Sequence, residues 1–184
     1  MNATTTYDLL PTPQGALLLI ARDGALAGVH FDGGRHAPAI GADWRHAPGD
    51  PLLAAARREL GEYFAGTRRA FDLPRGPAGT PFQRAVWQAI AAVPYGETIS
   101  YRELAQRVGR PAAVRAAGAA TGRNPWSIVV PCHRIVGADG TLTGYAGGLD
   151  RKRALLALEA GSDGSLSLGA HSGWSRRVES PLAA

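Results

Sequence analysis

The chain has 184 residues, of which 45% are hydrophobic and 19% are charged, so it can bury a packed core, and wholesale disorder is excluded. No apolar run approaches the roughly 18 residues that a membrane-spanning helix needs, and we expect no signal peptide because residues 1–10 lack a basic region followed by an apolar one. The single cysteine excludes an intrachain disulfide and a multi-thiolate zinc site, and it favours a reducing, intracellular compartment, which we expect to be the cytoplasm.

The formal net charge of +5 is unevenly distributed along the chain. Residues 1–78 contain eight arginines and eight acidic residues, whereas residues 79–184 contain twelve basic and seven acidic residues. Within residues 84–134, seven arginines stand beside only two acidic residues. A basic segment of this kind is typical of a protein that binds a polyanion such as nucleic acid, although a solvated arginine-rich surface gives the same pattern.

The first 49 residues predict strands and a loop. Residues 7–31 carry short apolar runs, and the Asp23-Gly24 pair between two of these runs predicts a β-hairpin. Residues 32–49 are rich in Gly, His, Pro and Asp and therefore predict a loop.

A helix follows, with Asp50 as its cap, Pro51 in its first turn and Gly66 at its end. Residues 68–79 then predict a short strand and a Pro/Gly linker, which separates two domains.

Two capping boxes mark helix starts in the second half of the chain. Thr80 and Gln83 begin the first helix, and Ser100 and Glu103 begin a second, shorter one that ends at Gly109. One face of the first helix is apolar and carries Phe82, Val86, Ile90 and Val93.

A third helix is predicted after a very short turn, with Pro111 at its start. Two short helices joined by a turn that contains Gly form a helix-turn-helix candidate. Between Ala112 and Gly122 nearly every side chain is small, and Arg115 is the only long one. Such a helix either packs closely in a core or enters a DNA minor groove, which is only about 6 Å wide, with one arginine projecting.

The only cysteine, Cys132, lies in the stretch VVPCHRIVG. A lone cysteine is usually a small buried hydrophobe, but the neighbouring His133 and Arg134 favour the reactive thiolate. Residues 127–131 predict a short buried strand. Because adjacent residues of a strand point to opposite faces, Cys132 and His133 can cooperate only if the strand ends at Pro131 or if a water bridges them.

Two further polar residues are candidates for the site. A final helix, capped by Asp150 and ended by Gly161, places Glu159 where the helix dipole disfavours a carboxylate. A residue in an unfavourable place can hold a functional partner such as a histidine, although a solvent-facing residue is the commoner case. Asn124 either turns the chain before a proline or lends its amide to the active site. Residues 162–184 lack periodicity and predict a poorly ordered tail.

The stretch PCHRIV, preceded by GRNP and followed by GYAGGLDRKRALLALE, closely resembles the methylated-DNA–protein-cysteine S-methyltransferases, which are the O6-alkylguanine-DNA alkyltransferases. The stretch TPFQRAVWQAIAAVPYGETISYRELA is similar to the same family, so the resemblance covers about residues 80–160. It implies an α+β fold with a small, ribonuclease H-like α/β domain over residues 1–76, built around an antiparallel hairpin sheet. A mainly helical, winged helix-turn-helix-like domain over residues 77–161 would carry the active site, and residues 162–184 would form a flexible tail.

The resemblance implies four catalytic residues. Cys132 would accept the alkyl group, and His133 would act as a base through a water. Glu159 would orient and polarise that histidine, and Asn124 would tie the recognition helix to the active-site segment.

It also implies residues for DNA and base binding. Tyr101 would crowd a phosphate and help to rotate the target nucleotide, and Arg115 would fill the gap that the nucleotide leaves. The DNA-facing helix would also present Ala116 and Gly118. The guanine pocket would be lined by Tyr145, Ala146 and the backbone around Ile135, with Lys152 nearby.

The implied partner is double-stranded DNA that contains O6-alkylguanine, bound in the minor groove by a monomer with a capacity for cooperative binding, and O4-alkylthymine is a further candidate substrate. The transfer to Cys132 would be irreversible and would need neither a cofactor nor a metal. Some relatives carry Ser in place of Ala146 and Pro in place of Ser127, so we expect altered base selectivity and a wider pocket. A four-cysteine zinc regulator, which some relatives have, is not expected.

Three alternatives remain open from the sequence. The first is an alkyltransferase-like protein that senses damage without catalysis, although that class lacks the acceptor cysteine. The second is a winged-helix DNA-binding regulator whose cysteine is inert. The third is a cysteine hydrolase, whose histidine normally lies far from the cysteine in sequence.

Overall fold

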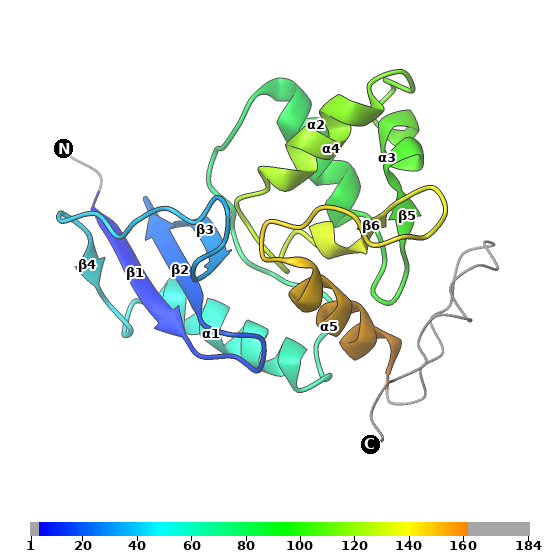
Figure 1. Ribbon diagram of the computed structural model, residues 1–184. Coiled ribbons are helices and arrows are strands. Elements are labelled where there is room, and N and C mark those ends of the chain that lie inside the picture. The colour runs from blue at the N-terminus through cyan, green and yellow to red at the C-terminus, as the bar shows by residue number, and fades with distance from the viewer. Residues whose placement is uncertain (1–3, 162–184) are drawn as a thin grey trace.

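The computed structural model describes residues 4–161, which form two packed units (Figure 1). The first unit contains a four-stranded sheet and one helix, and the second contains four α-helices and a two-stranded sheet. The expected α+β fold, with a small sheet domain followed by a mainly helical domain, is therefore confirmed. None of the helices in the described range is long and apolar enough to cross a membrane. The tail predicted over residues 162–184 lies outside the described residues.

The sheet of the first unit has the strand order β3-β2-β1-β4. Its strands are β1 (Thr5–Leu10), β2 (Leu17–Arg22), β3 (Ala25–Phe31) and β4 (Arg45–His46). Strands β2 and β3 pair antiparallel through Asp23 and Gly24, whose φ angles of 51° and 71° suit a tight hairpin turn, so the predicted hairpin is confirmed.

Two predictions for this unit are wrong. Residues 32–49 are not entirely a loop, because β4 lies within them and pairs parallel with β1. Residues 68–79 form no strand and make only an isolated bridge between Arg75 and Leu26. The bridge is held by Leu26 N donating to Pro74 O and Gly76 N donating to Leu26 O, and Pro74 has no N–H with which to extend this ladder towards residue 72.

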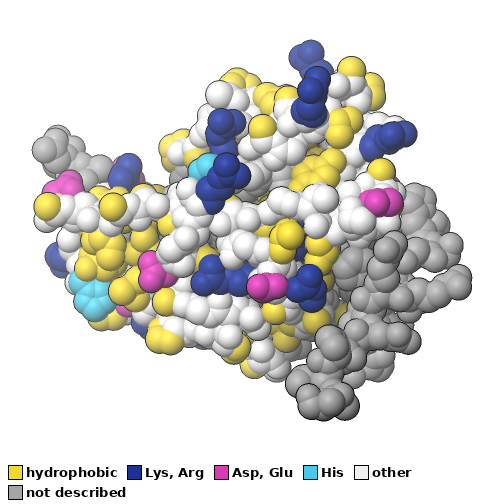
Figure 2. Space-filling model, in the orientation of Figure 1, with side chains coloured by type: hydrophobic (Ala, Val, Ile, Leu, Met, Phe, Trp, Pro, Cys, Tyr) yellow, Lys and Arg dark blue, Asp and Glu magenta, His cyan; other side chains and the backbone are white. Residues whose placement is uncertain are grey.

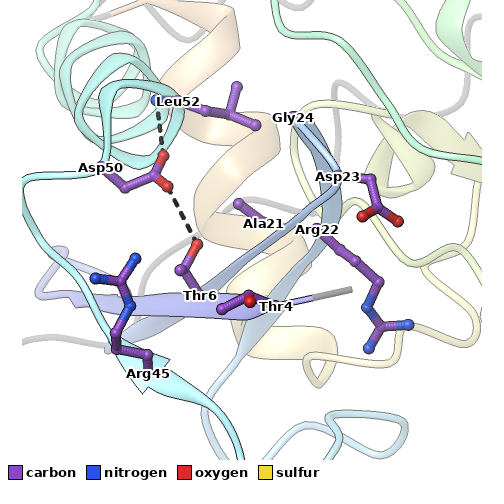
Figure 3. A pocket seen from close by; sticks show the side chains of 9 residues that line it. All are labelled: Thr4, Thr6, Ala21, Arg22, Asp23, Gly24, Arg45, Asp50 and Leu52. Atoms are coloured by element: carbon purple, nitrogen blue, oxygen red, sulfur yellow. Dashed lines mark hydrogen bonds between the residues drawn. The ribbon is translucent and has the colours of Figure 1, made fainter. Parts of the chain in front are cut away.

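Helix α1 (Pro51–Phe64) packs against this sheet and is anchored to it by its cap. The Asp50 carboxylate accepts hydrogen bonds from the backbone N–H groups of Leu52 (2.9 Å) and Leu53 (3.2 Å), as the sequence predicted. It also accepts a bond of 3.2 Å from the hydroxyl of Thr6 on β1, as Figure 3 shows. One side chain therefore satisfies the helix end and joins it to the sheet.

The pocket drawn in Figure 3 lies beside this cap and has a volume of about 220 Å³. Arg22 and Arg45 line it together with Asp23 and Asp50. Because the positive and negative side chains balance, the lining favours neither an anion nor a cation.

The second unit is built from α2 (Pro81–Ala91), β5 (Ile99–Ser100), α3 (Tyr101–Arg107), α4 (Val114–Gly122), the 3₁₀ turn η1 (Cys132–Arg134), β6 (Ile135–Val136) and α5 (Leu149–Ala160). Both predicted capping boxes are present, at Thr80 with Gln83 and at Ser100 with Glu103. The Trp87 indole donates to the carbonyl of Ala120 (2.9 Å) and so ties α2 to α4.

Two predicted helix starts in this unit are wrong. Helix α4 begins at Val114 and not at Pro111, because residues 110–113 close a separate turn in which Ala113 N donates to Arg110 O (2.8 Å). Helix α5 is preceded by Gly148, at φ 92°, and Asp150 lies inside its first turn, where it pairs with Arg153 and does not cap the helix.

We expect Asp50→Ala to lower the free energy of unfolding by about 1–2 kcal/mol, because the helix loses its cap and the bond to Thr6. Urea denaturation of the full chain measures this change. Asp43→Ala, at an exposed position of the loop before β4, is the matched control and should have little effect. Equal midpoints for the two variants would contradict the role given to the cap.

Candidate active site

The segment that leads to the cysteine is a tight buried loop, so the predicted strand over residues 127–131 is wrong. Ile128 has a φ of 71°, and two short-range bonds curl the chain: Val130 N donates to Trp126 O (2.8 Å) and Cys132 N to Val130 O (2.8 Å). The apolar residues reflect burial of this loop in the core. The chain leaves the loop through the 3₁₀ turn η1, so no strand geometry separates Cys132 from His133.

Asn124 closes this loop. Its side-chain N–H group donates to the Val130 carbonyl (2.7 Å) and to Sγ of Cys132 (3.2 Å), and its oxygen accepts from Trp126 N (3.0 Å). Asn124 follows α4 directly, so the amide connects the end of that helix to the sulfur. The structure thus places this predicted site residue in contact with the cysteine.

Cys132 is buried, with 5% of the residue exposed. Burial raises the pKa of this thiol, while the bond from Asn124 and the charge of Lys152 act in the opposite direction. Lys152 is itself buried and donates to the carbonyls of Ile135 (2.5 Å) and Thr143 (2.9 Å). Burial lowers the pKa of Lys152 to about 8. Lys152 is therefore the cation that acts on the thiol, whereas the sequence indicated the neighbouring Arg134.

The carboxylate of Glu159 accepts hydrogen bonds from several segments. Oε1 accepts from Nε2 of His133 (2.7 Å), the hydroxyl of Tyr63 (2.7 Å) and Nη2 of Arg134 (3.0 Å). Oε2 accepts from Nε of Arg134 (2.8 Å) and from Gly96 N (3.2 Å). Burial alone would raise the pKa of Glu159, but the charges and hydrogen bonds of His133 and Arg134 hold it well below its usual value. The group is therefore an ionised carboxylate in the interior.

His133 is fully buried. Burial lowers its pKa below the ordinary value and outweighs the attraction of Glu159. The neutral ring holds its proton on Nε2, where it donates to Glu159, so Nδ1 carries a lone pair. Nδ1 is buried and has no hydrogen-bond partner within the described range. The structure thus brings His133 and Glu159, two of the predicted site residues, into direct contact.

Two residues of this cluster have roles that the sequence did not indicate. Tyr63 has the spacing of an ordinary core residue of α1, and no local signal distinguishes it. Arg134 was expected to favour the thiolate, but its guanidinium binds Glu159 and donates to the Val93 carbonyl (2.5 Å).

A cavity of about 340 Å³ lies between the two units and brings together several predicted substrate residues. Tyr101 lines it from α3, and its hydroxyl donates to the Thr143 carbonyl (3.2 Å). Arg35 and His36 line it from the loop after β3, which the sequence did not connect with the site. The other lining residues are Gly118, Ala119, Gly122, Arg123, Gly144, Tyr145 and Ala146.

Other predicted residues do not line this cavity. Arg115 and Ala116 are exposed on α4, and the Ile135 side chain is fully buried. Figure 2 shows Lys and Arg side chains over the helical part of the face that it draws. Five arginines are exposed on or beside α3 and α4, namely Arg102, Arg107, Arg110, Arg115 and Arg123.

Comparison with known proteins agrees with this arrangement. Residues 5–75 match the ribonuclease-like domain, and residues 81–161 the DNA-binding domain, of 6-O-methylguanine DNA methyltransferases. The methylated-DNA–protein-cysteine methyltransferase of Methanosarcina barkeri is 45% identical over 153 residues, which are 83% of this chain and 96% of that protein. The Mycolicibacterium paratuberculosis protein of the same name is 47% identical, over 83% and 91% of the two chains. The crystal structure of Mycobacterium tuberculosis OGT in complex with DNA superposes with a TM-score of 0.75 at 42% identity, covering 84% of this chain and 92% of that one.

We expect Glu159→Gln to lower the free energy of unfolding at pH 7 by about 3–5 kcal/mol, because Arg134 would be left as a buried charge without its counter-ion. Chemical denaturation followed by tryptophan fluorescence measures the loss. Glu97→Gln, at an exposed position just before β5, is the control and should change stability by less than about 0.5 kcal/mol. A similar small loss in both variants would show that the carboxylate is not needed for stability.

Proposed function

The chain belongs to the methylated-DNA–protein-cysteine methyltransferase family, and we propose that it repairs DNA by transferring the alkyl group of O6-alkylguanine to Sγ of Cys132. One observation carries this proposal. Tyr101 and Tyr145, which line the cavity, pack against the same buried apolar cluster that contains Cys132. His133 directly follows this cysteine and is hydrogen-bonded to Glu159. Cys132 does not itself line the cavity, so a base that enters it would reach the sulfur past Tyr101 and Tyr145.

The target base must leave the duplex to enter this cavity. Extruding a base costs a few kcal/mol, and less when the damaged base pairs poorly. We place DNA on α3 and α4, where exposed arginines provide contacts for phosphates. Ala116 and Gly118 keep the surface of α4 low enough for a minor groove, and Arg115 would occupy the gap in the stack.

The reaction begins with removal of the thiol proton. His133 Nδ1 is the acceptor, reached through a water because no direct bond joins the ring to Sγ in the described part of the chain. Glu159 stabilises the imidazolium that forms. The thiolate then attacks the alkyl carbon in line, the carbon–O6 bond breaks, and its electron pair leaves with guanine. Tyr101, which lines the cavity, would then give that anion a proton.

The product is a thioether, which is stable and has no second thiol to displace it, since Cys132 is the only cysteine. Each molecule therefore reacts once. The site is complete within one chain, so we propose a monomer as the active form. We also propose the cytoplasm as its location, because the acceptor must stay a reduced thiol.

The decisive experiment is incubation with a duplex that contains one O6-methylguanine, followed by peptide mass mapping. We expect one added methyl group per chain, on Cys132, and no further reaction with excess DNA. Cys132→Ser should bind the same duplex without being alkylated. Reversible binding with an unmodified cysteine would instead indicate a winged-helix regulator or a damage sensor.

The pH dependence of this reaction tests the role of His133. Burial lowers the pKa of this imidazole below 6.5, and the ring accepts a proton only while it is neutral. The single-turnover rate should therefore be level from about pH 8 to about pH 6.5 and should fall only at lower pH. Stopped-flow or quench measurements over this range give the profile. A rate that keeps rising up to about pH 9 would mean that the thiol, whose own pKa is raised, ionises without the histidine.

A further inference from the structure

One of the side chains that bond to Glu159 comes from the N-terminal unit. Tyr63 lies on α1, is fully buried, and packs edge-on against the ring of Tyr95 at 6.1 Å between centroids. Its hydroxyl is 2.7 Å from Oε1 of Glu159 and 3.5 Å from Nε2 of His133. The residue therefore touches both members of the pair that is proposed to take the thiol proton.

The direction of the short hydrogen bond follows from the charges. Glu159 is ionised, so its oxygens can only accept. Burial, and then the nearby negative charge of Glu159, raise the pKa of Tyr63, so the phenol keeps its proton and donates it. Oε1 is therefore shared between the Tyr63 hydroxyl and the Nε2–H group of His133, at equal distances of 2.7 Å.

Sharing an acceptor has two consequences. The hydroxyl adds a contact from α1 to a carboxylate that Arg134 and Gly96 also hold, so Glu159 stays in place when this one contact is removed. It also disperses negative charge that would otherwise stabilise a protonated imidazole, because a carboxylate that accepts more hydrogen bonds is a weaker partner for each donor.

We propose that Tyr63 is a positioning residue for the alkyl transfer: it donates to the same Glu159 oxygen as His133 and so keeps the imidazole from becoming too basic to be neutral at physiological pH. This inference rests on the proposed function and assigns a part in it to the N-terminal unit. The residue acts through Glu159, and it touches neither the sulfur nor the cavity.

Replacing Tyr63 by Phe leaves the other ionisable groups around His133 and Glu159 unchanged. Cys132 and Arg134, on η1, and Lys152, on α5, lie beside His133. Tyr95 and Tyr145 lie close enough for their charges to interact with Glu159. Within the described chain, Tyr63 is the side chain from α1 that bonds to the carboxylate.

The test compares Tyr63→Phe with Tyr95→Phe in the full chain. Both remove a buried or half-buried phenol oxygen at the same interface, but the Tyr95 hydroxyl bonds weakly to the Leu158 carbonyl (3.4 Å) and not to Glu159. The pKa of His133 is read from NMR titration of labelled histidine, with the signal assigned by its loss in His133→Asn. The acid midpoint of single-turnover alkyl transfer is measured in parallel.

For Tyr63→Phe we expect both values to move upward by about 0.5–1 pH unit, the shift expected from one hydrogen bond to a charged group. Tyr95→Phe should leave both at the wild-type value. Unchanged values in Tyr63→Phe would overturn the proposal and reduce Tyr63 to a packing residue.

A second substitution at the same position keeps the proposal testable if Tyr63→Phe does not fold. 3-Fluorotyrosine, inserted at position 63 alone, keeps the hydroxyl and makes it a stronger donor, so both values should move downward. A shift in the opposite direction, or none, would contradict the proposal. If the wild-type protein transfers no alkyl group, the proposed function fails, but the NMR titration still decides whether Tyr63 controls His133.

Discussion

The contact between the two units and the geometry of the candidate site both depend on one buried carboxylate, that of Glu159. Glu159 is ionised in the interior, where an unpaired charge would be very unfavourable, and it is stabilised only because donors converge on it from separate parts of the chain. Tyr63 comes from α1, Gly96 from the turn after α2, and His133 and Arg134 from η1. The contacts that make this charge tolerable also join the two units and orient the histidine, so stability and catalysis share the same bonds.

The sulfur of Cys132 is held by a separate set of contacts. Asn124 holds the loop that carries Cys132, while Arg134, the nearest cation in sequence, is bound to Glu159. Burial raises the pKa of this thiol, so it is protonated at rest, and under the proposed mechanism its proton passes to His133. This arrangement suits a protein that reacts only once, because a permanently ionised, exposed sulfur would be lost to other electrophiles.

Local chemistry explains which parts of the fold were predictable. The Asp50 cap, both capping boxes and the Asp23-Gly24 turn involve residues within a few positions of one another, and each has the predicted form. The errors occur where long-range contacts outweigh local preference. β4 exists because β1 lies beside it, and the apolar residues before Cys132 form a loop because burial, not strand pairing, selects them.

The sequence by itself determined the N-terminal caps of α1, α2 and α3, the basic character of the second half, and a family motif that points to Cys132, His133, Asn124 and Glu159. It could not show that Tyr63 reaches Glu159 across 96 positions, that Arg134 neutralises the carboxylate, or that Arg35 and His36 line the cavity. These contacts join residues with no shared local pattern. Only the packing of α1 and the β3 loop against the helical unit brings them together, so the tertiary structure alone decided how the site is completed.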